Sequence, residues 1–534
     1  MSSNTSSVIC RVGLFQMLAC VALGQTPTTA DTIRFLEQST FGPNQTFINH
    51  VQSIGFAAFL QEQFAATAST YPTLPLQPTT VPASCTGTCV RDNYTMYPLQ
   101  VAFFENALTG SDQLRQRVAF ALQQIMVTSA LTINQPSWMS PYLQIFAQDA
   151  FSNFRTLLGD ITLNPAMGSY LNMAGNLKSA PNENYGRESL QLFTVGLNLL
   201  NADGSPMLDQ NGNPIPTYTQ PTVDAFSRVF TGWNLAAAPV SGTPNYLVPM
   251  VLNPANHDGG AKTLLNGVTL PAVTTVTAAS ANKDLSDALD NMFDHPNVGP
   301  FISVNLIEHL VTSNPSPAYI SRVTAAFNNN GSGVRGDLKA VVSAILLDPE
   351  ARNPTPAANF GHLTEPVLFI TKLLRLFNTT SATTDFVLSD SYLPSELVMS
   401  QNLFTSPSVF NYYPPTYTVP NTTVNGPEFD LDSTSTAYAR VNFVAETVYH
   451  TMSTSSPNRP TGTWLDFTSI LPSANSPFQL TGALNTLMLH GTMSPNLQAA
   501  VNNALSSMAG ATPLTRAQRA VYLIGSSPEY FVQR

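Results

Sequence analysis

The sequence predicts a mainly α-helical protein, with a multi-helical globular body that carries a small β-hairpin insertion near residues 199–275. Of its 534 residues, 43% are hydrophobic and 10% are charged, and the mean hydropathy is +0.03. This composition is typical of a globular chain, not a disordered one. Most periodic segments repeat their apolar residues at helical spacing, whereas tight-turn signals between short extended segments gather in the insertion.

The clearest helix signal runs from Asp112 to Ser129, where Leu114, Val118 and Leu122 recur on one face. A second segment from Pro141 to Leu158 repeats the pattern, and its proline suits a first helical turn. We expect further helices at 183–198, 222–233, 283–293, 300–312, 317–329, 336–347, 364–377, 435–453, 475–490, 495–508 and 514–525.

The strand signals lie between residues 199 and 275. Asp203-Gly204 and Asn211-Gly212 are tight-turn pairs, and Asn266-Gly267 separates two short extended segments. These pairs predict small hairpins on the helical body. The Pro- and Thr-rich stretch 67–84 is expected to be an irregular loop, as are residues 378–400 and 414–435.

Two predicted helices end in a similar way, as Leu347-Asp348-Pro349-Glu350 and as Ser526-Ser527-Pro528-Glu529. An internal duplication would explain the likeness. Ordinary chemistry also explains it, because proline stops helices wherever it occurs, and we favour that simpler interpretation.

The N-terminus has the pattern of a signal peptide. Arg11 precedes the short apolar stretch Val12–Gly24, which ends in small residues. We expect a signal peptide at 1–24, a secreted or periplasmic protein, and one large helical domain at 25–534. A buried or frayed N-terminal helix is the alternative.

Two of the four cysteines, Cys85 and Cys89, remain after such a cleavage. Two cysteines four residues apart in an exported chain favour a small local disulfide. A zinc site would need more ligands, and no histidine lies nearby in the sequence.

Charge and hydropathy exclude two kinds of partner. The formal net charge is −10 and no Lys/Arg-rich run occurs, so we expect no nucleic-acid partner. No apolar run beyond the signal peptide reaches the roughly 18–20 residues that span a bilayer, so we expect no transmembrane segment.

The segment Asn182–Thr194 is the most polar predicted helix in a chain poor in charge. On a helix, Glu183, Arg187 and Gln191 share one stripe, and Glu188 flanks it. Such a stripe lines a polar site, forms a structural network, or faces water.

A polar site here would draw other ionisable side chains to the stripe by folding, and carboxylates with imidazoles are suited to metal binding or acid–base catalysis. His257 and Asp258 beside two glycines are also ordinary turn residues, and His295 is also a residue favoured at a helix C-terminus. The candidates are Glu183, Arg187, Glu188, Asp224, His257, Asp258 and His295.

Several sequence blocks in order resemble a bacterial family catalogued as domain of unknown function 1800. The family implies a large, mostly helical and often exported protein without an established general activity. The blocks are Arg34–Gly42, Leu114–Leu122, Asn182–Gly196, Phe230–Trp233, His257–Lys262, His295–Asn297 and Phe360–Pro366.

The central helix departs from the pattern that many members of the family resemble. This chain has Gly186 for Ala, Ser189 for Leu, Gln191 for Glu and Phe193 for His. A site that needs that histidine or second glutamate is therefore not carried over, and Gly186 costs a helix interior about 1 kcal/mol relative to Ala.

These observations favour an extracytoplasmic, hydrolase-like enzyme. Glu183 and Glu188 would act as acid and base or as metal ligands, Arg187 would orient an anionic group, and His257 with Asp258 would complete the cleft. The alternative is a non-catalytic envelope or surface-associated protein in which the same residues form a structural network. The sequence leaves the cofactor, the metal and the substrate open.

Overall fold

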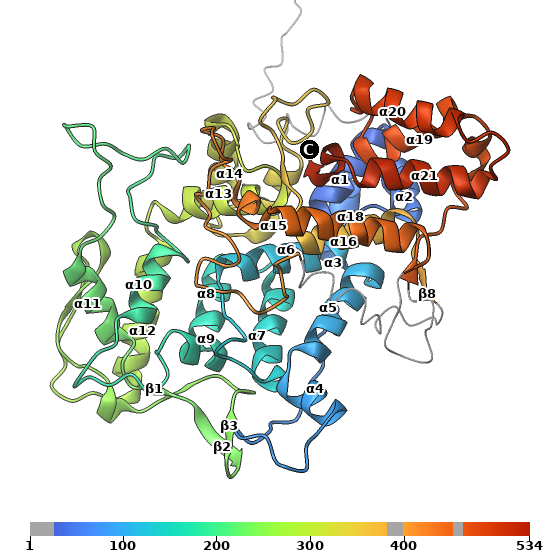
Figure 1. The fold of residues 1–534 in the computed structure, drawn as a ribbon. Helices are drawn as coiled ribbons and strands as arrows, with labels where there is room; N and C mark the ends of the chain where they lie inside the picture. The colour runs from blue at the N-terminus through green and yellow to red at the C-terminus, as the bar shows by residue number, and fades with distance from the viewer. Residues whose placement is uncertain (1–25, 382–398, 452–462) are drawn as a thin grey trace, which may run out of the picture.

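The computed structural model describes residues 26–381, 399–451 and 463–534. The expected signal peptide at 1–24 lies outside these residues, as does most of the expected loop at 378–400. The described chain is mainly helical, as predicted, and its sheets have two strands each. Figure 1 shows α10, α11 and α12 at one end of the molecule and α19, α20 and α21 at the other, with α6 and α16 between them.

The N-terminal third of the described chain contributes nine helices. One of them, α6, and the later helix α16 (Pro366–Leu376) mark the position of the core, because α6 buries eleven of its thirteen residues and α16 buries all of its residues. The nine are α1 (Thr29–Ser39), α2 (Gln45–Ile54), α3 (Phe56–Ala65), α4 (Thr88–Tyr94), α5 (Tyr97–Thr109), α6 (Gln113–Ile125), α7 (Pro136–Asp149), α8 (Phe154–Leu163) and α9 (Pro165–Tyr170).

The later helices follow the predicted order. None of the helices within the described ranges has the length and apolar character needed to cross a bilayer. They are α10 (Asn184–Gln191), α11 (Gln220–Val229), α12 (Ala278–Phe293), α13 (Val298–Leu310), α14 (Pro317–Asn328), α15 (Leu338–Leu346), α18 (Thr434–Val448), α19 (Pro477–Leu489), α20 (Pro495–Ser506), α21 (Pro513–Gly525) and α22 (Pro528–Phe531).

The predicted β insertion is confirmed as a set of short antiparallel pairs on both sides of α11. Isolated bridges join residues of 198–208 to residues of 206–216 before the helix. After it, β1 (Trp233–Asn234) pairs with β4 (Val251–Leu252), β2 (Ala236–Val240) with β3 (Thr243–Asn245), and β5 (Lys262–Thr263) with β6 (Thr269–Leu270).

The predicted boundaries at Pro141 and at residue 198 were wrong. Pro141 lies inside α7 instead of opening a helix, and a turn after Asp149 separates α7 from α8. The helix expected at 183–198 ends at Gln191, because Gly196 adopts a positive φ of 69° and its N–H bonds back to the Leu190 carbonyl at 3.0 Å. Glycine tolerates this left-handed conformation, which closes the helix.

The similar helix ends belong to two similar three-helix units, α13–α14–α15 and α19–α20–α21. In each unit the glutamate after the proline accepts hydrogen bonds from the backbone N–H and the Oγ–H of the serine that caps the middle helix. These pairs are Glu350 with Ser316 and Glu529 with Ser494, at sequence separations of 34 and 35. The tendency of proline to stop helices does not explain why both units have the same glutamate–serine contact at nearly the same sequence separation. The two units therefore favour an internal duplication.

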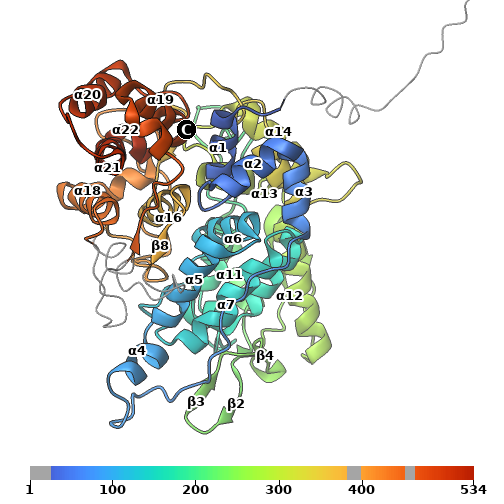
Figure 2. The ribbon, with the colours of Figure 1, turned by 90° about the vertical axis from the view of Figure 1, so that its right-hand side faces the viewer.

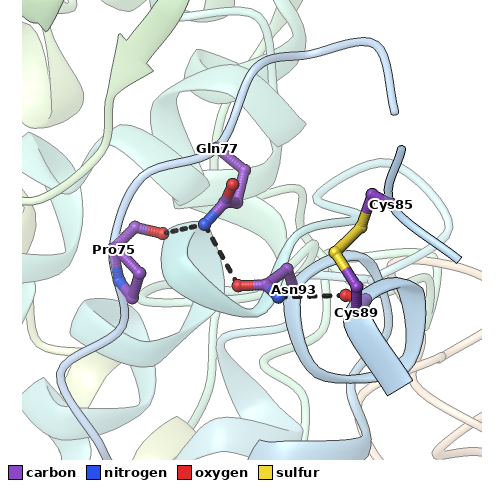
Figure 3. Close-up of a disulfide and its surroundings, with 5 residues drawn as sticks. All are labelled: Pro75, Gln77, Cys85, Cys89 and Asn93. Carbon is purple, nitrogen blue, oxygen red and sulfur yellow. Dashed lines mark hydrogen bonds between the residues drawn. A yellow bond between two sulfur atoms is a disulfide. The ribbon is translucent and has the colours of Figure 1, made fainter. Parts of the chain in front are cut away.

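The expected disulfide joins Cys85 to Cys89 at the start of α4 (Figure 3). Asn93 links it to the preceding loop: its Nδ2 donates to the Cys89 carbonyl at 2.9 Å, and its Oδ1 accepts from Gln77 Nε2 at 3.0 Å. The bond therefore fastens a surface helix to the irregular loop 67–84.

Removing this disulfide by Cys85→Ser and Cys89→Ser is expected to cost about 2 kcal/mol or less, because the closed loop is short. Since α4 has no buried residue, the loss should be local. Hydrogen exchange should quicken in α4 while the melting temperature changes by a few degrees at most. Protection lost throughout the core would contradict this expectation.

Candidate functional site

The predicted polar stripe lies where α10 meets α11. Arg187 forms an ion pair with Glu183 at 2.5 Å, and their side chains are 39% and 42% exposed. Gln220 of α11 donates through Nε2 to Glu183 at 2.9 Å and to Asp224 at 2.7 Å. The stripe thus brings Asp224 to Glu183, as expected, but the ion pair itself is open to water, where such pairs contribute little stability.

The sequence of α10 sets how closely it approaches α11. Gly186 faces the α11 backbone, and a Cβ there would lie 3.2 Å from the Ser227 nitrogen. The departure from alanine at this position therefore permits a closer contact between the two helices. Tyr185, one residue before, is buried and donates to Thr162 Oγ1 at 2.7 Å, which anchors the helix on α8.

Glu188 is in a different environment from Glu183. Its side chain is half-buried, and burial raises the pKa of its carboxyl, against the lowering effect of Arg187. Its Oε2 atom is enclosed and accepts no hydrogen bond from the described residues. Burial of this kind makes the protonated form of a carboxyl more favourable than it is in water.

Two tyrosines share the surroundings of Glu188. Burial and the Glu188 carboxyl both raise the pKa of Tyr170. Burial also raises the pKa of Tyr218, which both Arg187 and Glu188 influence, and the Tyr218 hydroxyl is enclosed without a hydrogen-bond partner among the described residues. Glu188, Tyr170, Tyr218 and Arg187 therefore form one electrostatically connected group, the Glu188 cluster.

His257 lies in a second network, built on the loop after α11. Its side chain is 1% exposed, and its Nδ1 contacts the Thr231 carbonyl at 2.9 Å while Nε2 lies 3.2 Å from Asp284 Oδ2. The fully buried Lys262 Nζ donates to the same Asp284 oxygen at 2.7 Å. Both imidazole nitrogens are engaged, which is the pattern of a structural histidine.

Asp258 is engaged as completely. Arg228 holds it through two hydrogen bonds, Nη2 to Oδ1 at 2.7 Å and Nε to Oδ2 at 3.1 Å, and the Gly260 N–H adds a third at 2.8 Å. Burial opposes ionisation of this carboxyl, but these bonds outweigh burial and lower its pKa. Asp258 therefore holds the loop to α11 as an ion-paired carboxylate.

The seven candidate residues fall into three places. Asp224 joins the stripe, whereas the structure describes no contact between His257 or Asp258 and Glu188. His295 lies apart: burial, with the nearby Arg335, lowers its pKa to about 4, and its Nδ1 accepts from the Asn297 N–H at 3.2 Å. Within the described ranges no three His, Cys, Asp or Glu side chains are arranged to hold a metal ion.

Comparison with known families gives a match over residues 34–532 to the family described as "Protein of unknown function (DUF1800)". The chain belongs to this family. The match confirms the resemblance carried by the sequence blocks and covers nearly the whole described chain. Comparison with curated proteins and with solved structures gives no match.

The DUF1800 blocks also contain a buried network that no spacing rule marks as a site. Arg117 of α6 is fully buried and donates through Nη2 to the His309 carbonyl at 2.5 Å. His362 Nδ1 lies 3.1 Å from Glu428 Oε1. Glu365 accepts hydrogen bonds from two glutamines, Gln124 and Gln401.

The available signal was the presence of ionisable residues inside apolar blocks, namely Arg117 in Leu114–Leu122 and His362 with Glu365 in Phe360–Pro366. In a chain that is only 10% charged, ionisable residues inside such apolar blocks indicate buried pairing. Their partners come from distant segments, so the sequence could not name them.

Proposed function

We propose that this DUF1800 protein is an exported, hydrolase-like enzyme in which Glu188 serves as the proton donor. The observation that supports this is the environment of Glu188. Its carboxyl is half-buried, its pKa is raised, and one of its oxygens accepts no hydrogen bond from a described residue. Groups with shifted pKa values and unmet hydrogen bonds concentrate at functional sites.

The side chains of the Glu188 cluster supply the following roles. The protonated Glu188 would donate its proton to a leaving-group oxygen or nitrogen as water attacks and the scissile bond breaks. The unpaired Tyr218 hydroxyl would donate a hydrogen bond to the substrate. Both bonds of Arg187, to Glu183 and Gln220, use Nη2. Its other N–H groups have no hydrogen-bond partner among the described residues, so Arg187 would orient an anionic group.

Glu188→Gln tests this proposal. If the protein hydrolyses any member of a panel of chromogenic esters, phosphate esters and glycosides, the variant should lose about 10²–10⁴-fold in kcat, the usual contribution of a positioned acid or base. Its melting temperature should stay the same or rise at neutral pH, because an amide needs no proton to be buried.

The matched control is Glu183→Gln, which removes the exposed carboxylate of the same helix and should leave kcat within a few-fold. A large fall in the melting temperature of Glu188→Gln without a specific loss of kcat would favour a structural carboxyl and contradict the proposal.

The second candidate is a non-catalytic envelope or surface-associated protein. The observation that favours it is the pairing of His257 and Asp258. Both side chains are engaged by other residues of the protein. Under this proposal no panel substrate is turned over, and Glu188 serves only to position α10 against its neighbours.

Export is part of both proposals. The apolar stretch before Gly24 and the Cys85–Cys89 disulfide support it, since disulfides persist in oxidising compartments. Sequencing the N-terminus of the protein recovered from periplasm or medium should find a chain that begins near Gln25. A full-length chain confined to the cytoplasm would overturn it.

A further inference from the structure

A cavity of about 380 Å³ lies between the end of α19 and the C-terminal segment that includes α22 and β10 (Val532–Gln533). Figures 1 and 2 both place this segment beside α19 and near α1. Its lining includes the apolar side chains of Met488, Leu489 and Val532 and the polar side chains of His490 and Glu529. A cavity of this size accommodates a small organic molecule.

His490 connects the cavity with the protein interior. Its side chain is 6% exposed, and its Nε2 lies 3.1 Å from Oε2 of Glu37, a carboxylate that is 1% exposed. Lys372 Nζ lies 3.7 Å from the other oxygen of Glu37. Burial opposes ionisation of Glu37, but Lys372 and His490 together lower its pKa, so a carboxylate stands behind the imidazole.

The Glu37 carboxylate favours one of the two neutral forms of the ring. A negative charge at Nε2 favours the tautomer with its proton on that nitrogen, which leaves Nδ1 as an acceptor. Nε2 has this ionic contact with Glu37 but no aligned hydrogen bond, and no hydrogen bond joins Nδ1 to the described part of the chain. His490 thus has an acceptor without a partner, in a side chain that is more than nine-tenths buried.

The hydroxyl groups that line the cavity already donate their hydrogen bonds to other atoms of the protein. Thr492 Oγ1 donates to the Leu489 carbonyl at 2.7 Å, and Ser494 Oγ donates to Glu529 at 2.5 Å. Each of these oxygens can therefore still accept a hydrogen bond through a lone pair. Together with the Glu529 carboxylate and His490 Nδ1, they make this wall a set of acceptors that suits a cationic donor.

We propose that this cavity binds a small primary ammonium compound with an apolar body, whose N–H groups meet Glu529 and His490. The body packs against Met488, Leu489 and Val532. Arg534 is exposed at the same cavity and attracts a carboxylate on the carbon that carries the ammonium group, so an apolar α-amino acid is the preferred form. This site is independent of the proposed role of Glu188.

Titration calorimetry on the whole protein with three matched probes tests the chemistry: norleucine, pentylamine (its carboxylate removed) and hexanoate (its amino group removed). Norleucine should bind most tightly and pentylamine about tenfold or more weakly, the value of one charge-assisted contact. Hexanoate should not bind. Binding of hexanoate as tight as that of norleucine, or no heat from either amine up to about 10 mM, would overturn the proposal.

Two variants with matched controls assign the site. Glu529→Gln should weaken pentylamine binding at least about tenfold, whereas Glu350→Gln, which alters the same serine cap in the duplicate unit, should not. His490→Asn should also weaken binding, since His490 has a positive φ of 53° that asparagine tolerates. His450→Asn, at a φ of 56°, is its control. Equal effects of either variant and its control would overturn the assignment.

Discussion

Replacing Lys262 by methionine is expected to lower the free energy of unfolding by about 3–5 kcal/mol, the cost of removing one partner from a buried ion pair. Lys262 is fully buried, and its Nζ donates to Asp284 Oδ2 at 2.7 Å and to the carbonyls of Asp258 and Gly260. Methionine fills the volume but leaves these acceptors unpaired. Chemical denaturation followed by circular dichroism measures the change.

Lys283→Met is the matched control, because Lys283 forms an ion pair with Asp287 on the neighbouring helix surface and its side chain is 72% exposed. That variant should unfold at nearly the same denaturant concentration as the natural chain. If Lys262→Met also leaves the free energy of unfolding unchanged, the network of His257, Lys262 and Asp284 does not stabilise the fold. The interpretation of His257 and Asp258 as structural residues is then wrong.

Glu308→Gln is expected to stabilise the protein, increasingly so as the pH rises. Burial, with the nearby Glu428, raises the pKa of Glu308 to about 8. The folded chain therefore holds a proton that the unfolded chain releases above a pH of about 4.5. The stability that this proton contributes is present below about pH 4.5 and is lost as the pH rises toward 8.

Glutamine mimics the protonated carboxyl at every pH and keeps an oxygen to accept the Asn425 hydrogen bond, which is 3.3 Å long in the natural chain. The stability gained by Glu308→Gln should grow by about 1.5 kcal/mol between pH 6.5 and pH 8. Glu105→Gln supplies the control, because water surrounds that exposed carboxylate in both states. A gain that does not change with pH would contradict the expectation.

Local features of the sequence were sufficient for the helical class and for the β insertion. Apolar spacing marked α6, α13, α14 and α15 within a few residues, and glycine-containing turn pairs marked the hairpins on either side of α11. The errors came at ends set by particular backbone contacts, as at Gly196, where a hydrogen bond to Leu190 stops α10 early.

The site was predicted less well, because a carboxylate acquires its chemistry from neighbours that are distant in the sequence. Periodicity placed Glu183, Arg187 and Glu188 on one helix. It did not indicate which of the three side chains would be buried. The burial of Glu188 depends on its tertiary surroundings, in which the pKa values of Tyr170 and Tyr218 also respond to its charge. Adjacent charges on one helix thus have different environments.

The sequence by itself determined the family, the helical class, the disulfide and the list of ionisable residues, since each of these depends on residue order and short-range spacing. Only the tertiary structure decided that His257 and Asp258 pair with Asp284 and Arg228, and that His490 lines a cavity with Glu37 behind it. The physical reason is that solvation and pairing of a charge depend on all segments packed around it, and those segments meet only when the chain folds.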